Sequence, residues 1–317
     1  MATYDETLIF VLNSKDATKN NGTMNSSVKF NFPLSLKYDA NIIKSHIQLV
    51  ACQIPVSFYI INQYNNVLKY TVSSVIYTVA LPFSNYNAYT IITALNSAFI
   101  LNGHSIIPTI NRGTGKLTFT GTTAFQFNTL NSTIMKILGF LPSINYNSVA
   151  NVLNAPFPLN LLGIKRLTLS SSSLSTVALN SNNYQTQSIL GTVFVSEPPF
   201  GLIKHKTETN VNHILRTRLL SSFEIIITDE DGNFVDFNNV EWLMKLKLSS
   251  TYELVLESKA TFKEITAQPP IIKEVPLTGL GSQIKEPNTI EEPYIFTPDN
   301  DLETLLYNSK KPPLISN

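Results

Sequence analysis

The chain has 317 residues, of which 43% are hydrophobic and only 14% charged, and its formal net charge is +1. This length and apolar content suffice for a folded core and exclude a disordered chain. The low charge, replaced by Asn, Ser and Thr, favours a component of an assembly over a freely diffusing protein. The near-neutral balance gives no electrostatic footprint for nucleic acid, so we do not expect nucleic acid among the partners.

Cys52 is the only cysteine, which excludes an internal disulfide and a multi-cysteine zinc site and fits a reducing compartment. It lies in the apolar run VACQIP, where we expect a buried, inert thiol. No apolar run reaches the roughly 18 to 20 residues that span a bilayer, so we expect no membrane span. The N-terminal residues show no basic region followed by an apolar one, and we expect no secretory signal.

Strand patterns dominate the first part of the chain. In SSVKFNFPLSL, the apolar residues Val28, Phe30 and Phe32 alternate with polar ones, which is typical of a half-buried strand. HIQLVACQIPVSFYII predicts a longer strand that is broken or bent at Pro55. VLKYTVSSVIYTVALP predicts strand, turn and strand, because β-branched and aromatic residues dominate it.

Residues 70–142 predict a small lobe of mixed structure inserted into, or packed on, this β body. A helix is expected after an N-cap at Asn87, with a stop at Asn102-Gly103. The apolar residues at helical spacing within it are Tyr89, Ile92, Leu95 and Phe99. IIPTINRGTGKLTFTGTTAFQFN then predicts a hairpin and a further strand, and STIMKILGF a short helix ended by Gly139.

The β body resumes at GIKRLTLSSSSL, so its predicted ranges are 1–69 and 143–256. In one of its closing strands Phe223, Ile225 and Ile227 share a face. In the last strand, Lys245 and Lys247 are expected to point away from an apolar face. The residues of that face are Trp242, Met244, Leu246 and Leu248. Residues 257–317 are proline-rich and cannot build a core of their own, which predicts an extended C-terminal arm.

The stretch TDEDGNFVDFNNVEW, residues 228–242, holds five carboxylates and no Lys or Arg. A calcium loop of the EF-hand type needs Gly at its sixth position and Glu at its twelfth, but Gly232 follows Asp229 by only three residues. Asp231-Gly232 between two apolar β runs instead predicts a hairpin turn, since Gly takes the positive φ that such turns require. We interpret these acids as solvated turn residues and expect no metal site.

No motif predicts catalysis. RGTGKLT, residues 112–118, lacks a Walker loop's first Gly and its Ser or Thr, because Ile110 and Leu117 occupy those positions; we expect a hairpin turn. No GxSxG elbow is present, although a Ser-His-Asp triad stays open because its members converge only in space. The histidines show no zinc-ligand spacing; they are His46, His104, His205 and His213. We therefore predict a protein that is not an enzyme, with no catalytic, cofactor-binding or metal-binding residues and no cofactor.

One basic cluster stands out, KHK at 204–206 together with Arg216 and Arg218. KHK begins the segment KHKTETNVNH, which we interpret as a polar, exposed linker. The favoured interpretation of the cluster is therefore a solvated loop beside a strand. It is also the first patch to test for contact with nucleic acid.

Four segments are familiar when taken together and in order: LNSKDATKNNGTMNSSVKFNFPLSL (12–36), QIPVSFYIINQYNN (53–66), LPFSNYNAYTIITALNSAF (81–99) with TGKLTFT (114–120) and ILGF (137–140), and ITDEDGNFVDFNNVEWLMKLKL (227–248). Together they resemble the penton, or minor capsid, proteins of virophages and Polinton-type viruses. The resemblance covers roughly residues 8–250 and leaves the proline-rich tail outside.

The resemblance implies an all-β fold, a single jelly-roll β-sandwich with an inserted small α+β lobe and an extended Pro-rich C-terminal arm. It implies a homopentamer at the five-fold vertices of an icosahedral capsid, with no catalytic residues to carry over. The implied partners are neighbouring double jelly-roll major capsid proteins and other minor capsid proteins. The implied location is the capsid vertex of a virion assembled in the host cytoplasm.

Two other functions stay open. The same β-sandwich could serve as a carbohydrate-binding or host-attachment module, which exposed aromatic residues clustered on one loop face would favour. The candidates are Tyr59, Tyr64, Tyr86 and Tyr89. An enzyme on this scaffold would need a pocket with convergent acids or histidines.

Overall fold

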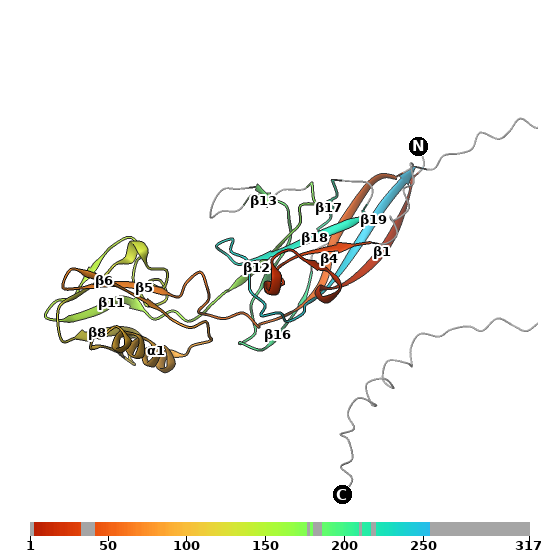
Figure 1. The fold of residues 1–317 in the computed structure, drawn as a ribbon. Helices are drawn as coiled ribbons and strands as arrows, with labels where there is room; N and C mark the ends of the chain where they lie inside the picture. Colours follow the sequence, from red (N-terminus) through yellow and green to blue (C-terminus); the bar gives the residue numbers. More distant parts are fainter. Residues whose placement is uncertain are drawn as a thin grey trace, which may run out of the picture. The chain divides into compact units, whose positions relative to one another are not determined.

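The computed structural model describes residues 3–32, 42–175, 178–179, 186–208, 211–216 and 220–253. Antiparallel strands make up about half of these residues, together with a single α-helix among them (Figure 1). The predicted arm, 257–317, lies outside the described residues, so it stays a prediction.

Two antiparallel sheets form the β body. The first has the order β1 (Thr3–Asn13), β19 (Leu243–Glu253), β4 (Ile42–Pro55) and β16 (Leu202–Lys206), and β17 (His213–Ile214) also pairs with β4. The second has the order β15 (Ile189–Phe194), β12 (Arg166–Ser170), β18 (Ser222–Thr228), β3 (Ser27–Asn31) and β2 (Thr18–Lys19). The shorter elements are η1 (Ser14–Asp16), η2 (Gly22–Met24), β13 (Ala178–Leu179) and β14 (Thr186–Gln187).

The strand order of these sheets is that of a jelly roll. Numbering the main strands β1, β3, β4, β12, β15, β16, β18 and β19 from one to eight gives 1-8-3-6 in the first sheet and 5-4-7-2 in the second. Successive strands therefore alternate between the sheets except at the fourth and fifth, which pair directly. This double Greek-key arrangement confirms the predicted all-β, single jelly-roll fold.

The core of the roll follows the predicted alternation of side chains. Phe223, Ile225 and Ile227 of β18 are fully buried, and so are Met244 and Leu246 of β19. Lys245 of β19 is exposed and Lys247 half-buried, because successive side chains of a strand point to opposite faces. The prediction of a strand buried on one side is therefore confirmed. Pro55 ends β4, as expected for a residue that cannot donate to the next ladder bond.

Trp242 fastens the start of the last strand to the N-terminal part of the chain. Its indole N–H donates to the carbonyl oxygen of Asn25 at 2.8 Å. Its backbone N–H donates to Ser14 Oγ at 3.0 Å, and Asn25 Nδ2 donates to the same oxygen at 2.9 Å. Trp242, Ser14 and Asn25 are all buried, so these bonds replace contacts that water supplies in the unfolded chain.

A second hydrophobic core belongs to the lobe inserted between β4 and β12. Its strands are β5 (Val67–Val72), β6 (Val75–Ala80), β9 (Phe125–Phe127) and β10 (Tyr146–Asn147) in one sheet, and β7 (Ile106–Ile110), β8 (Lys116–Gly121) and β11 (Val152–Pro158) in another. The lobe also holds α1 (Ala88–Leu101) and η3 (Thr129–Asn131). Its buried residues run from Ile61 to Ala155, which extends beyond 70–142 on both sides. The division into domains stays a prediction.

The connections into and out of the lobe touch each other. A Cβ atom at Gly163 would lie 3.2 Å from Cγ1 of Ile60, and Gly163 takes a φ of +64°. Ile60 precedes the first buried residue of the lobe core, and Gly163 follows the last half-buried residue packed against it, Leu161.

Helix α1 begins and ends as predicted. Asn87 caps it, since its Oδ1 accepts from the backbone N–H of Thr90 at 2.9 Å and the Thr90 hydroxyl accepts from the N–H of Asn87. The prediction that Tyr89 lies on the buried face of the helix is wrong, because its side chain is 61% exposed. The buried stripe consists of Ile91, Leu95 and Phe99, and Tyr89 lies about 200° around the helix from Ile91.

The short helix expected in STIMKILGF is wrong, because these residues form turns. The N–H of Leu138 donates to Ile134 at 3.2 Å and that of Phe140 to Met135 at 2.9 Å, but no further helical bond follows. Gly139 reverses the chain with a φ of +83°, and its carbonyl accepts from the N–H of Phe157 in β11 at 3.0 Å. This bond to a strand replaces the next turn of a helix.

Candidate functional site

The acidic stretch forms a tight turn at the end of β18. Asp229 Oδ1 accepts from the backbone N–H of Asp231 at 2.9 Å and of Asn233 at 2.8 Å, and Gly232 takes a φ of +86°. A β-bridge between Thr228 and Phe234 closes the turn. The predicted turn is therefore confirmed.

The expected hairpin between the two flanking strands is wrong. Strands β18 and β19 belong to different sheets and do not pair. The chain between them crosses from one sheet to the other, and the buried side chains of Val235, Phe237 and Trp242 anchor the crossing in the core. An alternating apolar pattern on both sides of a turn cannot distinguish a hairpin from such a crossing.

The acids of the turn line a polar groove of about 300 Å³. Its lining residues include Asn62, Tyr64, Asn65, Lys136, Asn160, Asp229, Glu230, Asp231 and Asn233. Several of their polar side-chain atoms already accept hydrogen bonds from backbone N–H groups. Asn65 Oδ1 accepts from the N–H of Asn62 at 2.7 Å, and Glu230 Oε2 accepts from the N–H of Lys165 at 3.3 Å. Within the described ranges no group of three or more His, Cys, Asp or Glu residues could hold a metal ion.

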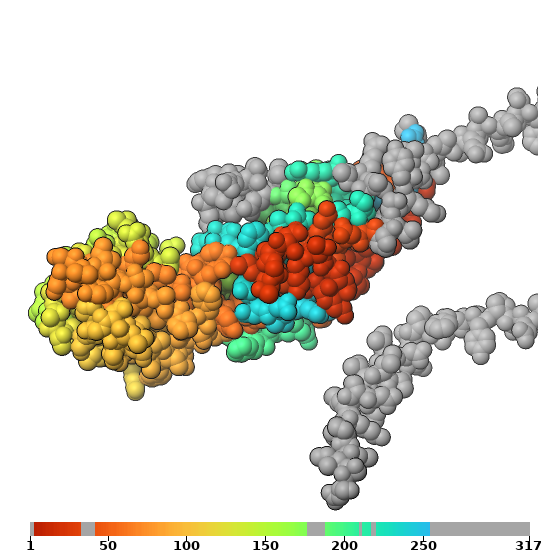
Figure 2. All heavy atoms as spheres, in the orientation of Figure 1, coloured from red at the N-terminus to blue at the C-terminus, as the bar shows by residue number. Residues whose placement is uncertain are grey.

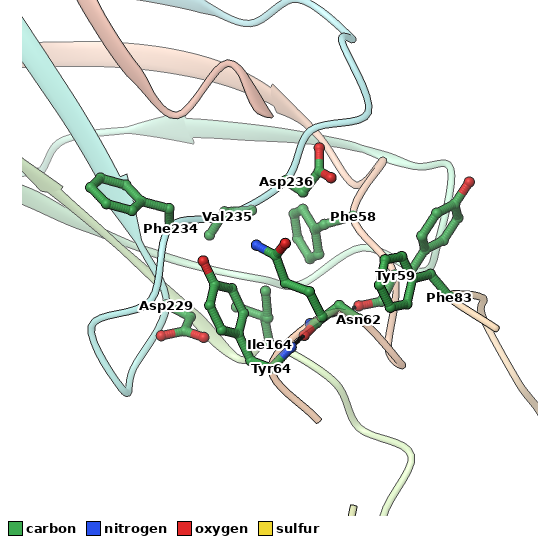
Figure 3. Close-up of a pocket in the computed structure, with 11 residues that line it drawn as sticks. Phe58, Tyr59, Asn62, Tyr64, Phe83, Ile164, Asp229, Phe234, Val235 and Asp236 are labelled. Atoms are coloured by element: carbon green, nitrogen blue, oxygen red, sulfur yellow. Dashed lines mark hydrogen bonds between the residues drawn. The ribbon is translucent and has the colours of Figure 1, made fainter. Parts of the chain in front are cut away.

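A smaller apolar pocket lies beside this turn (Figure 3). It is lined by Phe58, Tyr59, Asn62, Gln63, Tyr64, Phe83, Ile164, Asp229, Phe234, Val235 and Asp236. Its volume of about 20 Å³ admits one water molecule and no sugar ring. Of the four tyrosines proposed for an attachment face, Tyr59 and Tyr64 line this pocket. Tyr86 and Tyr89 line neither the pocket nor the groove.

The remaining candidates for chemistry do not converge. Cys52 is buried in β4, as expected, and burial raises the pKa of its thiol to about 12; its lack of reactivity stays a prediction. His213 lies in β17 and His205 in β16, so the expectation of an exposed linker there is wrong. The ring of His104 in the lobe bonds through Nδ1 to the Tyr70 hydroxyl at 2.9 Å. Burial lowers the pKa of His213.

The basic cluster also differs from its expected place. Lys204 and Lys206 are exposed on strand β16, which pairs with β4, so they do not form a loop. Arg216 is already engaged within the fold, since its Nε donates to the carbonyl of Leu174 at 2.7 Å. Arg218 lies outside the described residues. The pairing of β16 could not be predicted, because the polar sequence KHKTET has no apolar alternation.

Strand β1 presents an exposed apolar edge. It pairs with β19 along its whole length, and within the described part of the chain no strand pairs with its other side. Its exposed apolar residues are Tyr4, Leu8, Ile9 and Val11, with exposed fractions between 41% and 72%. In Figure 2 the N-terminal residues, in red, lie on the visible surface. A long apolar edge of this kind is a surface on which another chain can pack.

The strand order and the two-sheet core define a single jelly-roll protein with an inserted lobe. Among solved structures, the chain is similar to the mavirus penton protein, with 14% identity and a TM-score of 0.44 over 78% of this chain and 99% of that one. It is also similar to a chain of the Sputnik virophage structure, with 12% identity and a TM-score of 0.39 over 77% and 97%. No family model and no curated protein matches this chain. No helix in the described residues is long and apolar enough to cross a membrane.

Proposed function

We propose that this chain is a structural virion protein, a penton that forms homopentamers at the five-fold vertices of an icosahedral capsid. The observation that carries the proposal is the single jelly-roll strand order, in a chain whose segments resemble penton proteins. The neighbours we propose for it are double jelly-roll major capsid proteins and other minor capsid proteins. Its proposed location is the capsid vertex of a virion assembled in the host cytoplasm, and its proposed role is not enzymatic.

A closed ring needs two different surfaces on each subunit, because its contacts are heterologous. The first sheet offers an apolar surface at each of its edges. At one edge lie the exposed apolar residues of β1, including Val11 at 72% exposure. At the other edge, Phe200 is 82% and Leu202 43% exposed, next to β16. Two such surfaces on opposite edges of one sheet support a head-to-tail contact between neighbouring subunits.

The attachment-module alternative gains less support. The apolar pocket has room for a single water molecule, and several polar atoms of the groove accept hydrogen bonds from backbone N–H groups. Of the four tyrosines proposed for it, only Tyr59 and Tyr64 line this pocket.

The test is the native mass of the purified protein in solution, for the full chain and for residues 1–256. A pentamer of the full chain is the expected result, and its loss on truncation would make residues 257–317 a clamp between subunits. Val11→Glu and Phe200→Glu should each dissociate the pentamer because they place a charge in an apolar contact. Leu101→Glu, at an 86% exposed position of the lobe, is the matched control. Monomers in both forms would favour the attachment module instead.

A further inference from the structure

The outer face of the first sheet carries four lysines on two strands that flank β4. Lys204 and Lys206 come from β16, and Lys245 and Lys247 come from β19. They are about 40 residues apart in the sequence, and strand pairing brings them together. Their strand neighbours Ile203, Met244 and Leu246 are buried, which confirms that the lysine side chains point away from the core.

The pairing register fixes the spacing of these lysines. Ala51 of β4 pairs with Lys206 on one side and with Lys245 on the other. Their Cα atoms are therefore about 10 Å apart, which is two strand spacings. Along each strand the two lysines are separated by about 7 Å, because side chains on one face recur every second residue. The four ammonium groups thus form a patch with flexible four-carbon stems.

The patch is short of acidic partners. The side chains of Lys204, Lys206, Lys245 and Lys247 make no hydrogen bond or ion pair within the part of the chain that the structure describes. Seven other residues on this face pair, directly or through β4, with the four lysines, and none of them is acidic. They are Ile9, Val11, Asn13, Gln48, Ala51, Gln53 and Leu243.

The nearest acids lie at the margins of this face. Asp5 is four residues along the sheet from the row of Lys247, a distance of about 13 Å, and it accepts a hydrogen bond from Thr251. This distance exceeds the Debye length of about 8 Å at physiological salt. Glu208 lies just beyond the end of β16, two residues and about 7 Å from Lys206, so it offsets part of the charge at that corner. Glu241 lies two residues before the start of β19. Four lysines on β16 and β19, on either side of β4, therefore outnumber the acids near them.

We infer that this lysine patch binds the phosphate backbone of nucleic acid without reading its sequence. Lysine is a point charge on a flexible stem, so it follows a row of phosphates without a fixed geometry. The patch has no aromatic side chain on which bases could stack, so binding should come from charge alone and depend steeply on salt. The inference concerns the isolated chain and does not depend on whether the protein forms pentamers.

The experiment measures fluorescence anisotropy of a labelled 30-nucleotide oligo-dT with the full-length protein at 50 to 300 mM salt. The test variant replaces Lys204, Lys206, Lys245 and Lys247 with Gln. The matched control replaces four lysines elsewhere with Gln, so that net charge changes equally; these are Lys29, Lys69, Lys116 and Lys136. Circular dichroism and the fluorescence of Trp242 show whether both variants are folded.

The wild-type protein should bind at 50 mM salt, and the test variant should bind at least tenfold more weakly. The slope of log K against log salt should fall in magnitude by about 3, since each phosphate contact on a single strand contributes about 0.7. The control variant should stay within about twofold of wild type. Equal weakening of both variants would refute the inference, because only net charge would then matter. Binding of poly-glutamate without binding of oligo-dT would also overturn it and would indicate an acidic protein segment as the partner.

Discussion

Replacing Gly139 with Ala tests whether the lobe depends on the close approach between its turn and β11. Gly139 has a φ of +83°, and an added Cβ would lie 2.1 Å from the carbonyl oxygen of Phe157 and 2.9 Å from its carbonyl carbon. Both are backbone atoms of a strand, so a side-chain rotation cannot relieve the clash. The turn and the strand must separate, which strains the 3.0 Å hydrogen bond from the N–H of Phe157 to Gly139.

The expected loss has two parts. An L-residue at positive φ costs about 1 kcal/mol. Overpacking against backbone, together with the weakened hydrogen bond, adds about 2 kcal/mol or more. Gly103→Ala separates the two parts, because Gly103 has a similar φ of +78° but nothing within 4 Å of an added Cβ. We therefore expect a loss of about 1 kcal/mol for Gly103→Ala and about 3 kcal/mol for Gly139→Ala.

Urea unfolding followed by far-UV circular dichroism measures both variants against wild type. The single tryptophan, Trp242, lies in the roll core, so its fluorescence reports on the roll and not on the lobe. A lobe that unfolds separately would lose its dichroism signal before the Trp242 signal changes. Equal losses for the two glycine variants would refute the close-approach argument.

Three further predictions concern the roll. Ser14→Ala should lower the free energy of unfolding by about 2 kcal/mol in urea titrations followed by tryptophan fluorescence. The substitution removes the acceptor of the buried backbone N–H of Trp242 and of one N–H of the Asn25 amide, whose other N–H still donates to Val240. A loss under about 0.5 kcal/mol would contradict this. Cys52 should not react with a thiol reagent at pH 8 in the native protein but should react in urea, and rapid native labelling would refute its burial. Burial keeps the pKa of His213 in the folded chain below its usual 6.5, so below pH 6.5 the unfolded chain binds a proton that the folded chain does not. The free energy of unfolding should therefore fall as the pH drops below 6.5 and should not depend on this residue above it. His213→Gln should lessen the fall.

Local patterns predicted most of the roll and much of the lobe. The alternation in β18 and β19 gave the buried face correctly, because the period of a strand is two whatever its partner is. The cap at Asn87 and the turn at Asp229 were predictable for the same reason, since their hydrogen bonds join residues only two to four positions apart. The prediction for Tyr89 was wrong because helical spacing predicts an apolar stripe without stating which of two neighbouring stripes packs against the core.

Features that depend on distant pairing could not be predicted. The sheet to which β18 and β19 each belong is decided by the whole jelly-roll order and not by the turn between them. The lysine patch needs β16 and β19 on either side of β4, and these strands lie far apart in the chain. Strand β16 itself carries no apolar alternation beyond Leu202 and Ile203. Its pairing with β4 must come from the surrounding sheet.

The contact between Ile60 and Gly163 has a consequence for how this protein can diverge. About one hundred residues leave the roll and return to it at a single point, so a short loop between β4 and β12 could close the same gap with little change in chain entropy. The lobe also has a hydrophobic core separate from that of the roll, so we expect substitutions within the lobe core to leave the eight-strand framework folded. We therefore expect related chains to differ more in the lobe than in the roll, so that a sequence comparison would align at the strands and fail in the insert.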